Sequence, residues 1–426
     1  MSNVGIFMMP EYGGLNGSFA LARTLQRRGH HIRYFLSPEF EPHVARQGFG
    51  STLYSTGQHE PVESWATKVP GLRFLKLRAQ FLEHFASTFD AWVGKDALDA
   101  VLVDPVLWNV AAGALQKGLP YATLSPTYAA PFSLDYPPIH SPVVPRGAGA
   151  GARLRNLLAW GFQAWLPWGR AVHDQALACV GHDAPGRVRQ AGGRLLWGDF
   201  GYRPDVPELV IGPRALDFES ASARPGRSYL GTSVEPSRQD TTFDWSWYDP
   251  AKPLAYCSMG TFGHFRDVAK PFFSAVIESF RKREGWQLIV SCGGLAKTLR
   301  REDLPASIRV EKSVPQLEVL QRAQLFLMHA GIGSVREALF YGVPMLLFPI
   351  TMDQPGTAAR VEHHRLGLRG DIRTKDPATI TALVDRLVGR ADIAAAVEAM
   401  KRACQEQREL DEGADLVERM MRGARA

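Results

Sequence analysis

The sequence predicts an α/β protein with two doubly wound domains. Short apolar runs rich in β-branched and aromatic residues alternate with longer helical patterns, which is typical of parallel α/β units. The alternation stops near the middle of the chain and then starts again. At roughly 100 to 200 residues per domain, a chain of 426 residues has the length of two such domains.

The strand-like runs fall into two sets. In the first half they are residues 4–9, 32–36, 100–103 and 121–124. In the second half they are residues 255–258, 287–292, 308–310, 325–329 and 345–349. Between the first two runs, apolar residues at helical spacing end in Arg27-Arg28-Gly29, where cations and a glycine suit a helix C-terminus.

The domain boundary is expected near residue 225. Residues 212–253 contain several prolines and no sustained periodicity, which predicts an interdomain linker. We therefore assign residues 1–225 to an N-terminal domain, 226–400 to a C-terminal domain and 401–426 to a helical tail. The charged helical pattern at the end of the chain has no core of its own, so we expect the tail to pack on the N-terminal domain.

A second helical pattern follows a loop rich in proline and glycine at residues 126–151. Its apolar residues lie at helical spacing and include Leu154, Leu157, Leu158, Phe162 and Trp165. One interpretation is a helix packed on its own domain. The alternatives are an apolar wall for a lipophilic ligand, or an interfacial helix that contacts a membrane surface through its apolar face and nearby arginines.

The composition argues against several classes of protein. With 45% hydrophobic and 22% charged residues the chain is typical of soluble globular proteins. Its formal net charge of +6 is too small to indicate a nucleic-acid partner without a clustered basic stripe. The four cysteines show no C-x-x-C spacing, so neither a disulfide framework nor a thiolate zinc site is indicated. Because we find neither a signal-peptide pattern nor an apolar stretch of about 18 residues, we expect a cytoplasmic protein.

An anion site is predicted after the strand that ends near residue 328. The chain continues His329-Ala330-Gly331-Ile332-Gly333-Ser334 into a helix, whose free N–H groups and positive dipole end favour phosphate. The two glycines allow a close backbone approach, Ser334 adds a donor, and His329 adds a donor or a positive charge. Glu337 lies on the same helix face and can accept from ribose hydroxyls. Asp353 and Gln354 follow the next strand and suit a sugar.

These residues resemble the donor-binding signature of the GT-B UDP-sugar glycosyltransferases of family 1. The similarity runs from Val314-Pro315-Gln316 to Ala358-Ala359-Arg360 and is greatest to the macrolide glycosyltransferases and the zeaxanthin glucosyltransferases. The resemblance implies two Rossmann-like domains that face each other across a cleft, with the acceptor on the N-terminal domain and the nucleotide sugar on the C-terminal one. It departs at Thr357, where many members have asparagine.

The resemblance also implies a role for each donor-site residue. Val314 and Gln316 border the uracil and ribose, His329 and Ser334 hold the diphosphate, Glu337 holds the ribose, and Asp353 and Gln354 bind sugar hydroxyls. Ser258, Gly260 and Thr261 match a phosphate-side Ser-x-Gly-Thr loop of the family.

The N-terminal half departs from the family at its catalytic histidine. The loop Pro10-Glu11-Tyr12-Gly13-Gly14 aligns so that the histidine falls on Gly14, whereas Asp104 matches the aspartate that orients it. Three accounts compete: Asp104 acts as the base, directly or through water; the acceptor is a carboxylic acid or phenol that ionises easily; or the loop carries no chemistry. We favour the first and rank the loop residues Glu11 and His264 below Asp104.

The resemblance implies an inverting transferase that moves a hexose, glucose by preference, from a UDP-sugar to a hydroxyl of a lipophilic small molecule such as a carotenoid or polyketide. A TDP-linked deoxysugar is the alternative donor. No Asp-x-Asp motif occurs, so we expect no metal and no other cofactor. The rival functions are a nucleotide-sugar epimerase and a catalytically silent nucleotide-sugar-binding partner protein.

Overall fold

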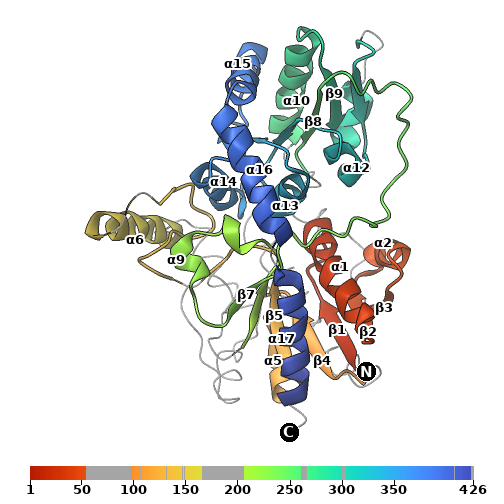
Figure 1. Ribbon diagram of the computed structural model, residues 1–426, viewed down its shortest axis with the longest axis vertical. Helices are drawn as coiled ribbons and strands as arrows, with labels where there is room; N and C mark the ends of the chain where they lie inside the picture. The colour runs from red at the N-terminus through yellow and green to blue at the C-terminus, as the bar shows by residue number, and fades with distance from the viewer. Residues whose placement is uncertain are drawn as a thin grey trace. The chain divides into compact units, whose positions relative to one another are not determined.

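The computed structural model divides into two compact units, each with its own parallel sheet (Figure 1). Unit 1 consists of Met1–Glu235 and Arg408–Ala426, and unit 2 of Pro236–Gln407. The structure describes residues 1–53, 97–105, 107–130, 132–145, 147, 149–165, 206–260, 266–299, 304–406 and 408–423. The α/β class predicted for both halves is confirmed.

Unit 1 has a seven-stranded parallel sheet with the order β3-β2-β1-β4-β5-β6-β7. Its strands are β1 (Asn3–Phe7), β2 (His31–Leu36), β3 (Gly50–Leu53), β4 (Ala100–Val103), β5 (Tyr121–Ser125), β6 (Glu208–Val210) and β7 (Arg227–Tyr229). Its helices are α1 (Tyr12–Arg27), α2 (Glu41–Arg46), α5 (Trp108–Gln116), α6 (Ala150–Trp165), α9 (Glu219–Ser222) and α17 (Glu409–Gly423), with 3-10 turns at Pro38–Phe40 and Arg214–Leu216. The central strands are buried on both faces, which explains their continuous apolar sequence.

Unit 2 has a six-stranded parallel sheet with the order β10-β9-β8-β11-β12-β13. Its strands are β8 (Leu254–Ser258), β9 (Gln287–Ser291), β10 (Ile308–Glu311), β11 (Leu325–Met328), β12 (Met345–Leu347) and β13 (Gly367–Arg369). Its helices are α10 (Arg266–Arg281), α11 (Ala296–Leu299), α12 (Gln316–Leu320), α13 (Ile332–Tyr341), α14 (Gln354–His363), α15 (Pro377–Val388) and α16 (Ala391–Glu406), with a 3-10 turn at Gly293–Leu295.

The predicted linker at residues 212–253 is only partly correct. Its first part folds into α9 and into β7, which pairs in parallel with β6 at the end of the unit 1 sheet. The change of unit falls after Glu235, beyond the expected boundary near residue 225. Strand β7 lacks an apolar run because Arg227 is part of it, with a guanidinium buried beside Glu208 and Asp217.

The charged pattern at the end of the chain forms two helices that belong to different units. Helix α16 is part of unit 2, whereas α17 packs against α1 and β7 of unit 1 and adds Ala414, Val417 and Met421 to that core. Arg28 at the end of α1 binds Asp415 of α17 at 2.5 Å. The tail therefore starts at residue 408 rather than at 401.

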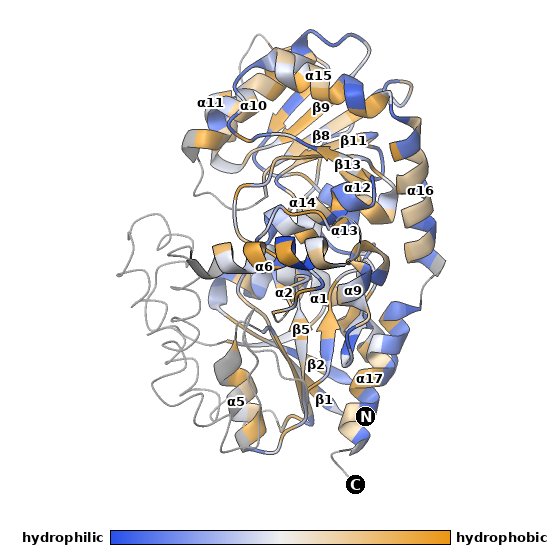
Figure 2. Cartoon of the chain, turned by 90° about the vertical axis from the view of Figure 1, so that its left-hand side faces the viewer, coloured by the Kyte–Doolittle hydropathy of each residue, from blue (hydrophilic) through white to orange (hydrophobic). Residues whose placement is uncertain are grey.

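Helix α6 carries the apolar pattern predicted for residues 154–165. Figure 2 shows hydrophobic residues along it. Leu154, Leu158 and Phe162 are exposed, the last at 68%, whereas Trp160 is buried and donates its ring N–H to the Tyr136 carbonyl at 2.9 Å. Packing on unit 1 therefore uses Trp160. In the part of the chain that the structure describes, no helix is long and apolar enough to cross a membrane.

Glu409, the first residue of α17, ties this helix to unit 1. Its buried carboxylate accepts the backbone N–H of Arg214 at 3.1 Å and lies beside Gly231. Burial raises the pKa of Glu409 to about 7, against the opposing effect of the Arg214 and Gly231 N–H groups. The folded chain therefore holds a proton here between about pH 4.5 and 7, where the unfolded chain has lost it.

We expect the contribution of Glu409 to stability to fall as the pH rises through this range. Thermal melting of the wild type and of Glu409→Gln at pH 5 and pH 8 measures it. Glutamine does not titrate. Between pH 5 and pH 8 the free energy of unfolding of the wild type should therefore fall relative to that of the variant, by no more than about 3 kcal/mol. Glu219→Gln, at an exposed position, is the control. The expectation would be contradicted if the difference in stability between the wild type and Glu409→Gln were the same at both pH values.

Candidate active site

In each unit, strands at the reversal of strand order deliver the predicted site residues. In unit 2, β8 and β11 pair with Ser258 opposite Met328, so Gly260 and His329 leave the sheet at its carboxyl edge. Strand β12 pairs with β11, with Leu347 opposite Met328, and it leads to Asp353 at the same edge. Open α/β sheets bind ligands outside the carboxyl ends of strands at such a switch point.

His329 packs between two glycines. A Cβ atom at Gly260 would lie 2.8 Å from the Nε2 atom of His329, and a Cβ at Gly331 would lie 2.4 Å from it. Gly260 also has φ +71, in the left-handed region that favours glycine, and its N–H donates to the Ser258 hydroxyl at 3.3 Å. Ser258, Gly260, His329 and Gly331 therefore lie together at this edge, and the lack of a side chain at Gly331 makes room for the imidazole.

The imidazole of His329 is neutral. Burial lowers its pKa to about 4, because the low-dielectric interior disfavours the charged form more than a hydrogen bond to the Ser258 backbone favours it. Of the two roles predicted for His329, a donor or a positive charge, only the N–H donor fits at neutral pH.

Helix α13 starts beside this ring. Gly331 is its N-cap residue with φ −63, and the turn before it passes through Ala330, whose φ of +66 is unusual for a residue with a side chain. Gly333 and Ser334 lie in the first turn, where backbone N–H groups have no partner within the helix. These groups and the helix dipole make the start of α13 suitable for a diphosphate.

A chain of hydrogen bonds joins Gln316 to Glu337. Gln316 donates its amide to Glu337 Oε2 at 2.7 Å and to the Ser334 hydroxyl at 3.4 Å. Its own oxygen accepts from Tyr256 Oη at 3.1 Å. The residues predicted to contact ribose therefore lie together beside the start of α13.

The cation that pairs with Glu337 is Arg238, which was not predicted from the sequence. Arg238 donates to Glu337 Oε1 at 2.6 Å and makes a two-pronged contact with Asp240 at 2.9 and 3.0 Å. Because Arg238 lies 99 positions before Glu337, in the segment expected to be a linker, no local pattern marks it.

Asp353 and Gln354 stand where the chain turns from β12 into α14. Asp353 is the half-buried N-cap residue of α14, next to Met352 with a φ of +59. Gln354 is buried, and its Oε1 accepts from the backbone N–H groups of Ile350 and Thr351 at 2.8 and 3.1 Å. The side-chain oxygen of Gln354 therefore stabilises the loop before α14. The side-chain NH2 group of Gln354 is the part suited to a sugar.

Two further predicted donor-site residues are Val314 and Thr261, and Thr357 is the position that departs from the family. Val314 is buried just before α12, and Thr357 is fully buried within α14. The substitution of threonine for the family asparagine at position 357 is therefore a change in the interior of unit 2. Thr261 lies outside the described residues, as does His264.

The predicted residues of unit 1 also meet at a switch point. Strands β1 and β4 pair with Phe7 opposite Val103, so Met8, Met9 and Asp104 follow at the same edge. Asp104 is 1% exposed, and its Oδ2 accepts the Met9 N–H at 3.4 Å. Burial at this level keeps Asp104 from direct contact with a large acceptor.

Gly13 and Gly14 lie in the first turn of α1, so the loop expected at residues 10–14 ends earlier than predicted. Helix α1 begins at Tyr12 and includes Gly17 and Ser18, whose hydroxyl binds Tyr34 Oη at 2.8 Å inside the core. A Cβ at Gly14 would lie 3.1 Å from Met8 Cε and 3.6 Å from Glu11 Oε1. A methionine and a carboxylate therefore border the position of the family histidine.

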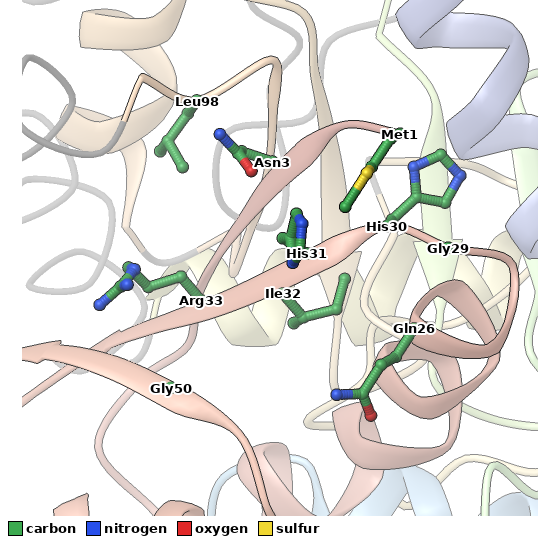
Figure 3. A pocket seen from close by; sticks show the side chains of 10 residues that line it. All are labelled: Met1, Asn3, Gln26, Gly29, His30, His31, Ile32, Arg33, Gly50 and Leu98. Carbon is green, nitrogen blue, oxygen red and sulfur yellow. The ribbon is translucent and has the colours of Figure 1, made fainter.

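A pocket of about 580 Å³ lies elsewhere in unit 1. It is lined by the starts of β1, β2 and β3, including Asn3, His31 and Gly50 (Figure 3). These are the amino ends of the strands, whereas the predicted residues gather at the carboxyl ends. The predicted site residues of unit 1 therefore lie at the opposite edge of its sheet from this pocket.

Comparison with known proteins agrees with this geometry. Residues 292–416 match the family model of the erythromycin biosynthesis protein CIII-like C-terminal domain. The chain is 25% identical over 385 residues to the NDP-glycosyltransferase YjiC of Bacillus subtilis (strain 168), covering 89% of this chain and 87% of that one. It is 26% identical over 403 residues to the oleandomycin glycosyltransferase of Streptomyces antibioticus, covering 90% and 84%.

Other similarities extend over nearly the whole chain. The zeaxanthin glucosyltransferase of Pantoea ananas is 26% identical over 382 residues, covering 87% of this chain and 84% of that one. The crystal structure of the glycotransferase of kitacinnamycin has a TM-score of 0.76 at 23% identity, with 99% of each chain covered. The spinosyn rhamnosyltransferase SpnG complexed with thymidine diphosphate has a TM-score of 0.66 at 17% identity, covering 99% of this chain and 100% of that one. The family-model match, the named relatives and the similar structures together support a family 1 glycosyltransferase of the GT-B fold, a class of enzymes that use nucleotide sugars.

Proposed function

We propose that the protein transfers a hexose, glucose by preference, from a UDP-sugar to a hydroxyl of a lipophilic small molecule, with inversion at the anomeric carbon and without a metal. The observation that carries this proposal is that Gln316 contacts both Ser334, in the first turn of α13, and Glu337, in the same helix. The start of α13 can donate to a diphosphate, and the Glu337 carboxylate can accept ribose hydroxyls. The names of two relatives, an oleandomycin glycosyltransferase and a zeaxanthin glucosyltransferase, support a natural-product acceptor.

Unit 2 supplies the donor site. The backbone N–H groups at the start of α13 and the Ser334 hydroxyl donate to the diphosphate and stabilise the charge that develops on the departing UDP. The single N–H of the neutral His329 joins them when it exchanges its contact with the Ser258 backbone for the diphosphate. Asp353 accepts from sugar hydroxyls and Gln354 donates its amide to the sugar. Val314 borders the base.

Unit 1 supplies the proton acceptor for the hydroxyl. Since Asp104 is 1% exposed, it acts as base through a bound water rather than by direct contact. Gly14 leaves the site without the family histidine. An acceptor that ionises by itself, such as a carboxylic acid or a phenol, would need this help least.

We expect Asp353→Ala to lower turnover about 100-fold or more, because it removes an acceptor for the sugar hydroxyls. UDP affinity should remain within about twofold, since the aspartate is assigned to the sugar and not to the nucleotide. The assay measures UDP release and product mass with UDP-glucose and a panel of natural-product alcohols, and NMR of the product gives its anomeric configuration. The exposed Asp385→Ala is the control. Unchanged turnover in Asp353→Ala would remove Asp353 from the sugar site.

The affinity for UDP-glucose should change less than about threefold between pH 5.5 and pH 8. His329, with a pKa of about 4, is neutral over this whole range and donates a hydrogen bond without a charge. Isothermal titration calorimetry at the two pH values tests this, and His329→Gln, which retains an N–H donor, should bind better than His329→Leu. A tenfold loss of affinity from pH 5.5 to 8 would instead indicate a bound imidazolium.

Asp104→Asn should lower turnover of an alcohol acceptor about 100-fold, because the amide cannot take up a proton. With a carboxylic acid acceptor the loss should be less than about fivefold, since that group arrives ionised. Initial rates with both acceptors, at saturating UDP-glucose, measure the difference. Equal rates of wild type and variant with the alcohol would exclude Asp104 as the base.

A further inference from the structure

The carboxylate of Glu337 is held from both sides inside unit 2. Arg238 donates to Oε1 at 2.6 Å, and Gln316 donates to Oε2 at 2.7 Å. Each carboxylate oxygen can accept about two hydrogen bonds, so each keeps capacity for a further donor. The carboxylate is thus fixed in orientation while it remains able to accept.

The partners of Glu337 are fixed in turn. Gln316 accepts the Tyr256 hydroxyl at its oxygen, which directs its amide toward Glu337. Arg238 binds both oxygens of Asp240 through Nε and Nη2, which directs its Nη1 toward Glu337. A two-pronged contact with a carboxylate holds the planar guanidinium in one geometry.

Burial makes the arginine necessary. The side chains of Arg238 and Glu337 are 4% and 6% exposed. Burying a carboxylate this deeply costs free energy unless a cation compensates its charge, and Arg238 supplies that cation at 2.6 Å. The nearby diphosphate of a donor would add a further negative charge.

We propose that Arg238, positioned by Asp240, holds the Glu337 carboxylate in the orientation that accepts the 2′-hydroxyl of a nucleotide, and thereby makes the donor site selective for ribonucleoside over 2′-deoxyribonucleoside diphosphates. Arg238 and Asp240 are positioning residues, because they act through Glu337. The proposal rests on the proposed function, in which Glu337 holds the ribose.

The test compares binding of UDP and of 2′-deoxy-UDP by calorimetry, without acceptor or turnover. The wild type should bind UDP at least tenfold more tightly, as expected for a hydrogen bond to a charged acceptor. Arg238→Met should bind UDP about as weakly as 2′-deoxy-UDP, while its affinity for 2′-deoxy-UDP stays within about threefold of the wild type. Arg373→Met, at an arginine that is 81% exposed, is the matched control and should discriminate like the wild type.

Two further variants separate positioning from a loss of folding. Arg238→Lys keeps the charge but not the two-pronged contact, so it should retain part of the discrimination. Glu337→Gln should lose discrimination between the two nucleotides. Adding Arg238→Met to Glu337→Gln should weaken UDP binding no further, because the effects of two residues that act through one another are not additive.

The outcomes are distinct. If Arg238→Met and Arg238→Lys weakened the binding of UDP and of 2′-deoxy-UDP equally, the positioning role would be overturned and the proposed donor would stand. A wild type that binds UDP and 2′-deoxy-UDP equally well would overturn the selectivity. A wild type that binds neither nucleotide would overturn the UDP donor together with this inference.

Discussion

The parallel pairing of β8 with β11 in unit 2, and of β1 with β4 in unit 1, is the constraint on which the candidate site residues of each unit depend. Parallel neighbours end at the same edge of a sheet, so residues far apart in sequence leave it side by side. This pairing brings Gly260 against the imidazole of His329, across about 70 residues of chain. It also brings the Met9 N–H to the carboxylate of Asp104.

Close packing at these edges determines the chemistry of the side chains. His329 is neutral because two glycines let the backbone enclose its ring, and the same enclosure removes the water that would solvate an imidazolium. Glu337, inside helix α13, is also buried, but Arg238 lies beside it as an ionic partner. Of these two buried groups, only Glu337 therefore has an ion pair that offsets the cost of burying a charge.

Much of this architecture could be predicted from local sequence. The long apolar strands and the sequence from His329 to Ser334 have periodicity and composition that do not depend on distant residues, and the structure places them within one or two residues of the predicted positions. The missed strands β3, β6, β7 and β13 are three or four residues long, and β7 includes the buried Arg227. Their conformation comes from pairing with a neighbour, not from their own pattern. Arg238 and the charge state of His329 escaped prediction for the same reason, since both depend on tertiary contacts.

The return of α17 to unit 1 has a consequence for the way the protein is made. The chain completes a sheet in its first 235 residues, then runs through the whole of unit 2, and only afterwards supplies the helix that covers α1 and β7. During synthesis, therefore, the apolar surface that will receive Ala414, Val417 and Met421 is formed before its cover exists. Unit 2 can fold on the ribosome as a continuous segment, whereas unit 1 must wait for residues that are translated after unit 2 has been completed.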